Sequence, residues 1–294
     1  MIKRVLCIEN PARLSLKLAQ MVVELQDVTR TVPIEDIGVV ILDNKQITIT
    51  HALIDALLAN NVAIVTSNDK HLPVGLMLPL DGHNLQSERF REQIDASEPL
   101  KKQMWQQTVV AKILGQAHVL SMQHIEHSNM LKWAKEVRSG DTDNLEARAA
   151  AYYWRNVFEN DEFVRDSEGL PPNSLLNYGY SIVRAMMARA LVGAGLLPTL
   201  GIHHHSRYDA YCLADDIMEP YRPFVDIKVL EMWKKGGITN DISSEQKREL
   251  LGVTTMDVNI SGHRSPMMLA IHSTAQSVQK CYSGEARKII YPDW

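Results

Sequence analysis

The segment from Gly201 to Asp226 carries the residue types that most readily do chemistry. It places three consecutive histidines ahead of a group of acids and reads GIHHHSRYDAYCLADDIMEPYRPFVD. Asp215, Asp216 and Glu219 stand at positions i, i+1 and i+4, so on a helix each aspartate neighbours the glutamate. Carboxylates this close repel one another unless a cation or a basic side chain compensates their charge. The segment therefore indicates a site that holds positive charge.

A divalent metal ion is the first candidate for that charge. A histidine is available upstream of the acids, and one imidazole nitrogen combined with carboxylate oxygens suits Mg²⁺ or Mn²⁺ better than thiolate-bound metals. The alternative is that the acids form a solvated helix face and the histidines a surface loop. Apolar Ile217 and Met218 separate the acids, and this interleaving favours acids held against a core.

Length and composition describe an ordinary globular chain. At 294 residues, with 45% hydrophobic and 22% charged residues, two domains are the expected organisation. The first apolar stretch stops at Glu9, too short for a signal peptide. No apolar run approaches the roughly 18 residues of a membrane span. Cys7, Cys212 and Cys281 form neither a disulfide framework nor a Cys-x-x-Cys site, so we expect a reducing, cytoplasmic location without membrane contact.

The overall charge argues against a broadly basic nucleic-acid surface. The formal net charge is −4 and the sequence pI is about 6.3, whereas nucleic-acid-binding domains usually carry a basic footprint. Any such surface must be a local stripe of cations. Four arginines around the histidine segment are the candidates: Arg184, Arg189, Arg207 and Arg222.

The hydrophobic pattern changes period near residue 82. Before that point, alternating and short apolar runs predict a hairpin across 14–25, strands at 37–42, 47–50, 62–66 and 74–78, and one helix at 51–59. After it, the period is helical, and we expect helices at 99–126, 144–158, 173–192 and 266–282. The sequence predicts a β-rich domain over 1–82 and a helical domain over 83–294.

Glu146 is a second candidate carboxylate. On a helix it shares one face with Ala150, Tyr153 and Val157, and a carboxylate on such an apolar face needs a partner if it is buried. The alternative is an exposed first-turn glutamate, which the helix dipole favours.

Three motifs in order give the chain a recognisable pattern. Glu146 with AlaAlaAlaTyrTyrTrp, then Asn173-Ser-Leu-Leu-Asn-Tyr-Gly-Tyr180, then the 201–226 segment together resemble the CRISPR-associated integrase family that inserts new spacers into CRISPR arrays. The resemblance is closest to the version of type II systems. It extends over nearly the whole chain and includes Lys112-Ile-x-x-Gln116 in the first long helix.

The resemblance implies an α+β fold in which a small N-terminal β-sandwich domain that dimerises precedes a larger all-α-helical catalytic domain. It also implies a site for Mg²⁺ or Mn²⁺. By motif, the metal ligands, which are also the catalytic residues, are Glu146, His204 and Glu219. Asp216 and Asn177 would hold these ligands in place. Candidate phosphate contacts are Lys112, Arg207 and Arg222.

Two assignments within this set stay open. His203 and His205 are alternatives to His204, although an extended segment would point His204 at the carboxylates and its two neighbours away together. Arg222 could instead pair with Asp226, which follows it at i+4.

The function implied is a metal-dependent DNA integrase and endonuclease. It would insert short foreign DNA from phages or plasmids into a CRISPR array, through attack of a DNA 3′-hydroxyl on a phosphodiester. The implied partners are double-stranded DNA, a second copy of the chain, and a small dimeric CRISPR-associated protein. The alternatives are a stand-alone metal-dependent nuclease, a transposon-type integrase of the same fold, or a catalytically inactive DNA-binding scaffold.

Overall fold

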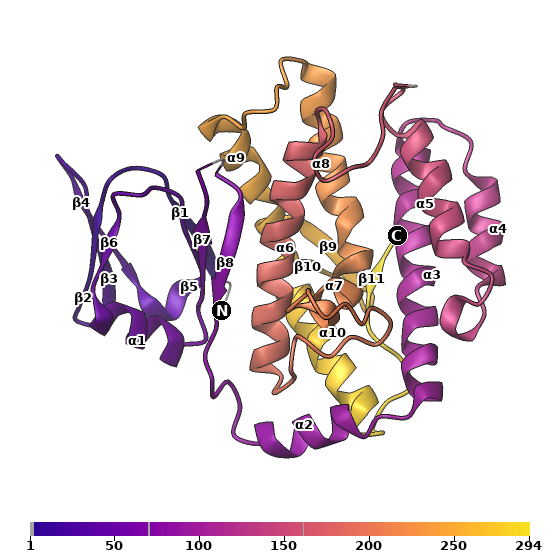
Figure 1. Ribbon diagram of the computed structural model, residues 1–294, viewed down its shortest axis with the longest axis horizontal. Helices are drawn as coiled ribbons and strands as arrows, with labels where there is room; N and C mark the ends of the chain where they lie inside the picture. The colour runs from indigo at the N-terminus through magenta and orange to yellow at the C-terminus, as the bar shows by residue number, and fades with distance from the viewer. Residues whose placement is uncertain (1–2, 70, 161) are drawn as a thin grey trace. The chain divides into compact units, whose positions relative to one another are not determined.

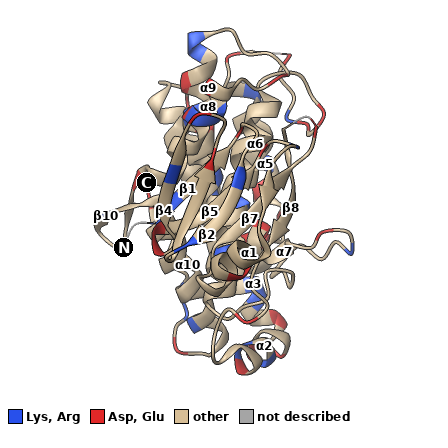
Figure 2. Ribbon diagram, turned by 90° about the vertical axis from the view of Figure 1, so that its left-hand side faces the viewer, with Lys and Arg blue, Asp and Glu red and all other residues tan. Residues whose placement is uncertain are grey.

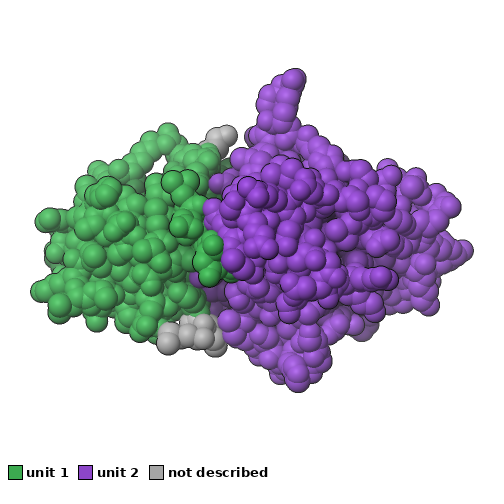
Figure 3. Space-filling model, turned by 90° about the horizontal axis from the view of Figure 1, so that it is seen from below, with its two compact units in different colours: residues 1–84 green, residues 85–294 purple. Residues whose placement is uncertain are grey.

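The computed structural model describes residues 3–69, 71–160 and 162–294. The chain divides into two compact units, Met1–Asn84 and Leu85–Trp294 (Figure 3). This division falls two residues beyond the change of period in the sequence. Within the described ranges, no helix combines the length and the apolar character needed to cross a membrane.

The described residues of the first unit form two four-stranded sheets and one α-helix (Figure 1). One sheet has the order β1-β5-β7-β8, with β1, β5 and β7 parallel and β8 antiparallel to β7. The other has the order β4-β3-β2-β6, in which β2 and β3 form the expected hairpin. The elements are β1 Arg4–Ile8, β2 Arg13–Lys17, β3 Gln20–Glu24, β4 Thr29–Pro33, β5 Ile37–Leu42, β6 Thr48–Ile49, α1 His51–Ala59, β7 Ala63–Ser67 and β8 Pro73–Met77.

Both sheets and α1 contribute to one apolar core. Leu14 and Met21 from β2 and β3 join Val40 of β5 and Leu53 of α1 in a single buried cluster. The sequence of β5, IGVVIL, is apolar throughout because the strand lies between two neighbours in its sheet and is buried along nearly its whole length.

The second unit is mainly helical (Figure 1). Its longest helix, α3, begins after Ser97, whose hydroxyl accepts a hydrogen bond from the Leu100 amide, and Pro99 occupies its first turn. The helices are α2 Gln86–Ile94, α3 Glu98–Met122, α4 Ser128–Glu136, α5 Leu145–Asn156, α6 Asn173–Gly193, α7 Cys212–Met218, α8 Arg222–Lys235, α9 Ser244–Leu251 and α10 Met267–Tyr282.

The expectation of an all-α second domain is wrong in one respect. Three short strands, β9 Asp257–Ile260, β10 His263–Pro266 and β11 Pro292–Asp293, form a small antiparallel sheet in the order β10-β9-β11. Strands of two to four residues are too short to give a period-2 signal. The third strand also comes from a segment far along the chain, so no local pattern announces the pairing.

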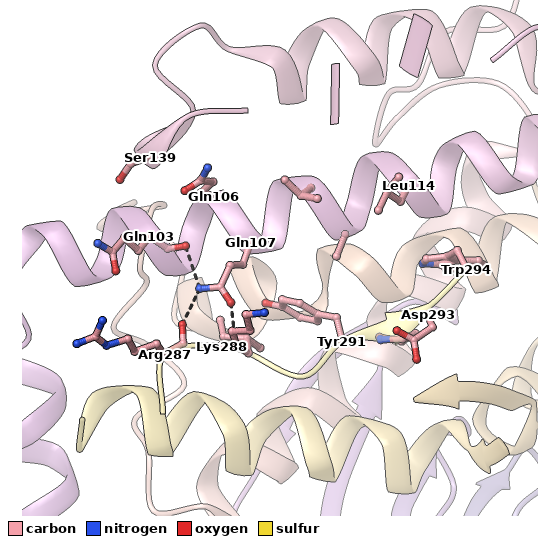
Figure 4. Close-up of a pocket in the computed structure, with 14 residues that line it drawn as sticks. Gln103, Gln106, Gln107, Leu114, Ser139, Arg287, Lys288, Tyr291, Asp293 and Trp294 are labelled. Carbon is pink, nitrogen blue, oxygen red and sulfur yellow. Dashed lines mark hydrogen bonds between the residues drawn. The ribbon is translucent and has the colours of Figure 1, made fainter. Parts of the chain in front are cut away.

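The last residues of the chain form hydrogen bonds with side chains of α3. The side chain of Gln107 donates to the Arg287 carbonyl and accepts from the Ile289 amide (Figure 4). The Tyr291 hydroxyl lies 2.7 Å from that of Thr108. A cavity of about 860 Å³ lies between α3 and this segment. None of the candidate site residues lines that cavity.

Charged side chains are mixed rather than segregated on the shorter helices. On α2, for example, the acids Glu88 and Glu92 flank Arg89 and Arg91 (Figure 2). This agrees with a chain whose net charge is small, and it leaves electrostatic recognition to individual sites.

Candidate metal centre

The ammonium of Lys112 joins two of the candidate ligands. It donates a hydrogen bond to Glu146 Oε1 and lies 2.6 Å from Glu219 Oε2. Lys112 comes from the middle of α3, Glu146 from the first turn of α5, and Glu219 from the turn that follows α7. Two carboxylates more than seventy residues apart in sequence therefore converge on one positive charge.

Asp141 fixes the position of Glu146. One oxygen of its buried carboxylate accepts the Leu145 amide and the other accepts the Glu146 amide, each at 2.9 Å. These bonds satisfy donors that the start of α5 would otherwise leave unpaired. The sequence reasoning missed Asp141, although the polar run Ser-Gly-Asp-Thr-Asp-Asn before the helix could have indicated a cap.

Glu219 lies between two cations. Arg222, one turn on, donates from Nε to Glu219 Oε1 at 2.7 Å, and Lys112 approaches Oε2. Burial alone would raise the pKa of Glu219, but Arg222 and Lys112 outweigh it and lower the pKa to about 2. Burial likewise opposes the charge on Lys112, yet Glu219 and Glu146 raise its pKa above the ordinary value. Glu219 and Lys112 are thus held in their charged forms.

Asp216 orients His204. Its fully buried carboxylate lies 2.5 Å from His204 Nδ1 and accepts the amides of Ile202 and His203 at 2.8 and 2.9 Å. In the neutral form of the ring, an Nδ1 that donates to the carboxylate leaves the lone pair on Nε2. This bond, assisted by the charges of Asp216, Glu219 and Glu146, raises the pKa of His204 against the opposing effect of burial.

His203 does not point away from His204, as an extended segment would require. The chain bends at Ile202 and His203, and the two imidazoles lie edge to face, with ring centroids 5.0 Å apart. His203 stacks on the buried Trp105 at 4.2 Å, and His204 meets the same indole edge-on at 5.5 Å. The expectation of alternation was wrong because the segment turns, and because α3 supplies an aromatic surface for both rings.

The three closely spaced acids do not share one cation. Asp215 forms a two-point ion pair with Arg184, at 2.6 and 2.5 Å, Asp216 binds His204, and Glu219 binds Lys112 and Arg222. Successive helical residues point in different directions, so neighbours in sequence reach different partners. Burial raises the pKa of Asp215 to about 6 even with Arg184 beside it.

The remaining candidates have other partners. Arg222 pairs with Glu219 rather than with Asp226 and lies over the Tyr180 ring at 4.6 Å, while Asp226 accepts from the hydroxyls of Tyr153 and Tyr180. Asn177 accepts from Arg165 and donates to the Ser167 carbonyl. Arg207 is exposed and lies over Tyr208.

The donor set fits a hard divalent cation. Glu146 and Glu219 already hold a shared cation, Lys112, and His204, whose Nδ1 is bound to Asp216, offers Nε2 as a nitrogen ligand in its neutral form. In the described part of the chain, the ligand atoms of Cys7, Glu9 and Asp43 in the first unit all lie within 4.8 Å of one another, whereas those of Glu146, His204 and Glu219 do not. That second group mixes a thiol with two acids, and His71 Nδ1 lies 2.9 Å from Asp43.

Known proteins resemble the chain over most of its length. The family model described as CRISPR associated protein Cas1 matches residues 5–258. A CRISPR-associated endonuclease Cas1 from Neisseria meningitidis is 36% identical over 278 residues, which are 94% of this chain and 91% of that protein. A second Cas1 endonuclease, from Pyrobaculum aerophilum, is 26% identical and covers 92% of this chain and 95% of its own length.

Solved structures share the fold at low sequence identity. A casposase bound to integration product matches 98% of this chain and 92% of its own, with a TM-score of 0.77 and 18% identity. A CAS1 protein from Thermotoga maritima matches 99% and 100% of the two chains, with a TM-score of 0.76 and 15% identity. On the family model and the Neisseria relative, the chain belongs to the Cas1 family of CRISPR-associated proteins.

Proposed function

We propose that the chain is a metal-dependent DNA endonuclease and integrase that inserts short foreign DNA segments as new spacers into a CRISPR array. The observation that carries the proposal is the convergence of Glu146 and Glu219 on one cation beside a carboxylate-bound His204. Family membership and the endonuclease named among the relatives support it.

The reaction exchanges one phosphodiester for another. A DNA 3′-oxygen bonds to phosphorus as the bond to the leaving 3′-oxygen breaks, and the proton of the attacking hydroxyl passes to solvent or a nearby base. Mg²⁺ or Mn²⁺ held by Glu146, His204 and Glu219 would stabilise the charge that develops on the phosphoryl oxygens. Asp216 holds the imidazole through Nδ1 so that Nε2 faces outward as a ligand. The exchange needs no nucleotide cofactor.

Cations of this chain would contact the DNA backbone. Arg207 is exposed beside the histidine segment and carries no acidic partner among the ion pairs of the described residues, so it suits a phosphate. Lys112 and Arg222 are engaged with Glu219 and would reach a phosphate only by leaving it. Asn177 would act indirectly, by holding Arg165.

The assembly we propose follows from the family. The first unit is a β-sandwich domain over 1–82 that pairs with a second copy, and the helical unit over 83–294 carries the catalysis. A solved chain that shares this fold is part of a Cas6-RT-Cas1–Cas2 complex. We propose that a small dimeric partner of the Cas2 kind and double-stranded DNA complete the assembly, in the cytoplasm.

A strand-joining assay tests the proposal. A duplex with 3′-hydroxyl ends is incubated with a supercoiled plasmid that carries a CRISPR repeat, in the presence of the partner protein. Mn²⁺ should support joining, and EDTA or a dideoxy 3′ end should abolish it. Glu146→Gln and Glu219→Gln should lower the rate at least about 100-fold, as loss of a metal's contribution does, while Glu136→Gln on the exposed face of α4 should not.

The same assay separates the alternatives. An inactive scaffold would bind the duplex with equal affinity in Mn²⁺ and EDTA and join nothing. A stand-alone nuclease would cut the DNA without joining it, and a transposon-type integrase would join equally well to a plasmid without a repeat. Either of the last two results would remove spacer insertion from the proposal while keeping the metal centre.

A further inference from the structure

Lys112 occupies the place between the two proposed metal-binding carboxylates. Its ammonium contacts Glu146 and Glu219 at once, and its side chain is only 11% exposed. Arg222 adds a second positive charge on the other oxygen of Glu219. Two carboxylates are therefore already neutralised by two cations. If Lys112 and Arg222 stayed in place, a divalent ion bound to these carboxylates would be repelled by two positive charges beside its ligands.

Gln116 offers a second place for the ammonium. It follows Lys112 by one helical turn on α3, so both side chains lie on the same face. Its Oε1 atom is buried and has no hydrogen-bond partner, which is unusual because a buried unpaired acceptor costs about 1–3 kcal/mol. An unsatisfied carbonyl one helical turn from the ammonium of Lys112 is an acceptor that the ammonium could use.

A small cavity joins the two positions. Its volume is about 150 Å³, enough for a side chain to change rotamer. Asp226 and Glu219 supply negative charge to its wall, beside the guanidinium groups of Arg165 and Arg222. Its lining residues are Lys112, Gln116, Trp154, Arg165, Tyr180, Glu219, Arg222, Pro223 and Asp226.

We propose that Lys112 is an internal competitor of the metal, with two alternative positions. Without metal, its ammonium bridges Glu146 and Glu219 and keeps the carboxylates together. With metal bound, the ammonium moves within the cavity and donates to Gln116 Oε1. This inference rests on the proposed metal centre at Glu146 and Glu219. Since the lysine must leave before the metal can bind, metal affinity is set below the value that the ligands alone would give.

The test measures Mn²⁺ affinity, without DNA, by the electron paramagnetic resonance signal of free Mn²⁺. Lys112→Met removes the competing charge and should tighten binding about tenfold, a difference of about 1.4 kcal/mol. Lys112→Gln also lacks the charge, while its amide can still bond to a carboxylate, and it should tighten binding in the same direction. Gln116→Leu removes the second acceptor and should weaken binding several-fold. Lys132→Met, on the exposed face of α4, is the control and should leave the affinity unchanged.

Melting temperatures supply a readout independent of affinity. Without metal, Lys112→Met should melt below wild type, because Glu146 and Glu219 lose the charge between them. Saturating Mn²⁺ should raise its melting temperature by more than it raises that of wild type.

The outcomes separate this inference from the proposed function. If Glu146→Gln binds Mn²⁺ as tightly as wild type, the proposed metal centre is wrong. If Glu146→Gln weakens binding but both lysine variants bind as wild type or more weakly, only the competition is overturned. Tighter binding by the lysine variants with no change in Gln116→Leu would remove Gln116 as the second position.

Discussion

His203 and His204 are the residues whose roles the geometry distinguishes most finely. Both rings contact Trp105, but only His204 is held by Asp216 at Nδ1. We expect His204→Ala to abolish metal-dependent joining, because a ligand nitrogen is lost. His203→Ala should lower the rate less, through loss of the stacked neighbour, and His205→Ala least. Rates of the three variants in Mn²⁺ test this order. If His204→Ala were fully active and His203→Ala inactive, the metal ligand would be His203 and not His204.

The buried carboxyl group of Asp226 should make the stability of the folded protein depend on pH. Burial raises its pKa to about 6 from 3.8, in spite of the hydrogen bonds from Tyr180 and Tyr153 that lower it. The folded state therefore binds this proton more tightly than the unfolded state does. The stability it contributes is fully present below about pH 4 and is lost as the pH rises through 6.

Asp226→Asn removes this titration. Relative to wild type, its free energy of unfolding should rise by up to about 3 kcal/mol between pH 4 and pH 7, since each pKa unit corresponds to about 1.4 kcal/mol. Urea unfolding of the helical unit at several pH values measures the difference, with Asp143→Asn at the surface as the control. If the free energy of unfolding changed with pH to the same extent in wild type and Asp226→Asn, burial would not raise the pKa of Asp226.

At the scale of elements, the approach of the histidine segment to α7 depends on Gly201. A Cβ atom at Gly201 would lie 2.2 Å from the His204 carbonyl oxygen and 2.9 Å from Asp216 Oδ2. Gly201→Ala must therefore displace the segment that carries His204. We expect joining to fall about tenfold or more while the helical fold persists, since overpacking typically costs about 1–3 kcal/mol.

Gly252→Ala is the matched control for that prediction. A Cβ atom there meets no heavy atom within 4 Å, and its φ of −57° is open to any residue. Circular dichroism and joining rates of both variants are the measurements. Equal activity of Gly201→Ala and Gly252→Ala would mean that the histidine segment adapts without loss.

Local pattern was sufficient for elements whose signal is contained within them. The helix at His51–Ala59 and the strand at Ile37–Leu42 have the bounds that the sequence predicts. In each, the hydrophobic period and the residues that end the element lie within or next to the segment. The strands β9 and β10 were missed because each is too short to give a period-2 signal, and β11 because it pairs with β9 from a distant segment. Pattern reasoning has no access to such pairing.

The same limit applies to the candidate site. Residue types and motifs were enough to select Glu146, Glu219 and Asp216 as charged groups that need partners. The cation that pairs with both glutamates, Lys112, lies on another helix, and the start of the Glu146 helix is held by Asp141. The turn at His203 likewise depends on Trp105 of α3, which no property of the histidine segment reveals.

At the scale of the whole molecule, we expect the first unit to pair with a second copy. Its edge strand β8 carries Val74 and Met77, which are 65% and 45% exposed, and an edge with exposed apolar side chains is a template for pairing. Light scattering at micromolar concentration should give the mass of a dimer, and Val74→Lys with Met77→Lys should shift it toward the monomer. A wild-type monomer at this concentration would contradict the proposed assembly.

Anomalous diffraction from crystals soaked in Mn²⁺ tests the metal centre most directly. We expect one strong peak from an ion bound by Glu146, His204 and Glu219, with Lys112 withdrawn from Glu219 toward Gln116. A weaker peak near Cys7, Glu9 and Asp43 would leave this claim intact. No peak at Glu146 and Glu219, with Lys112 still bridging them in saturating Mn²⁺, would contradict it.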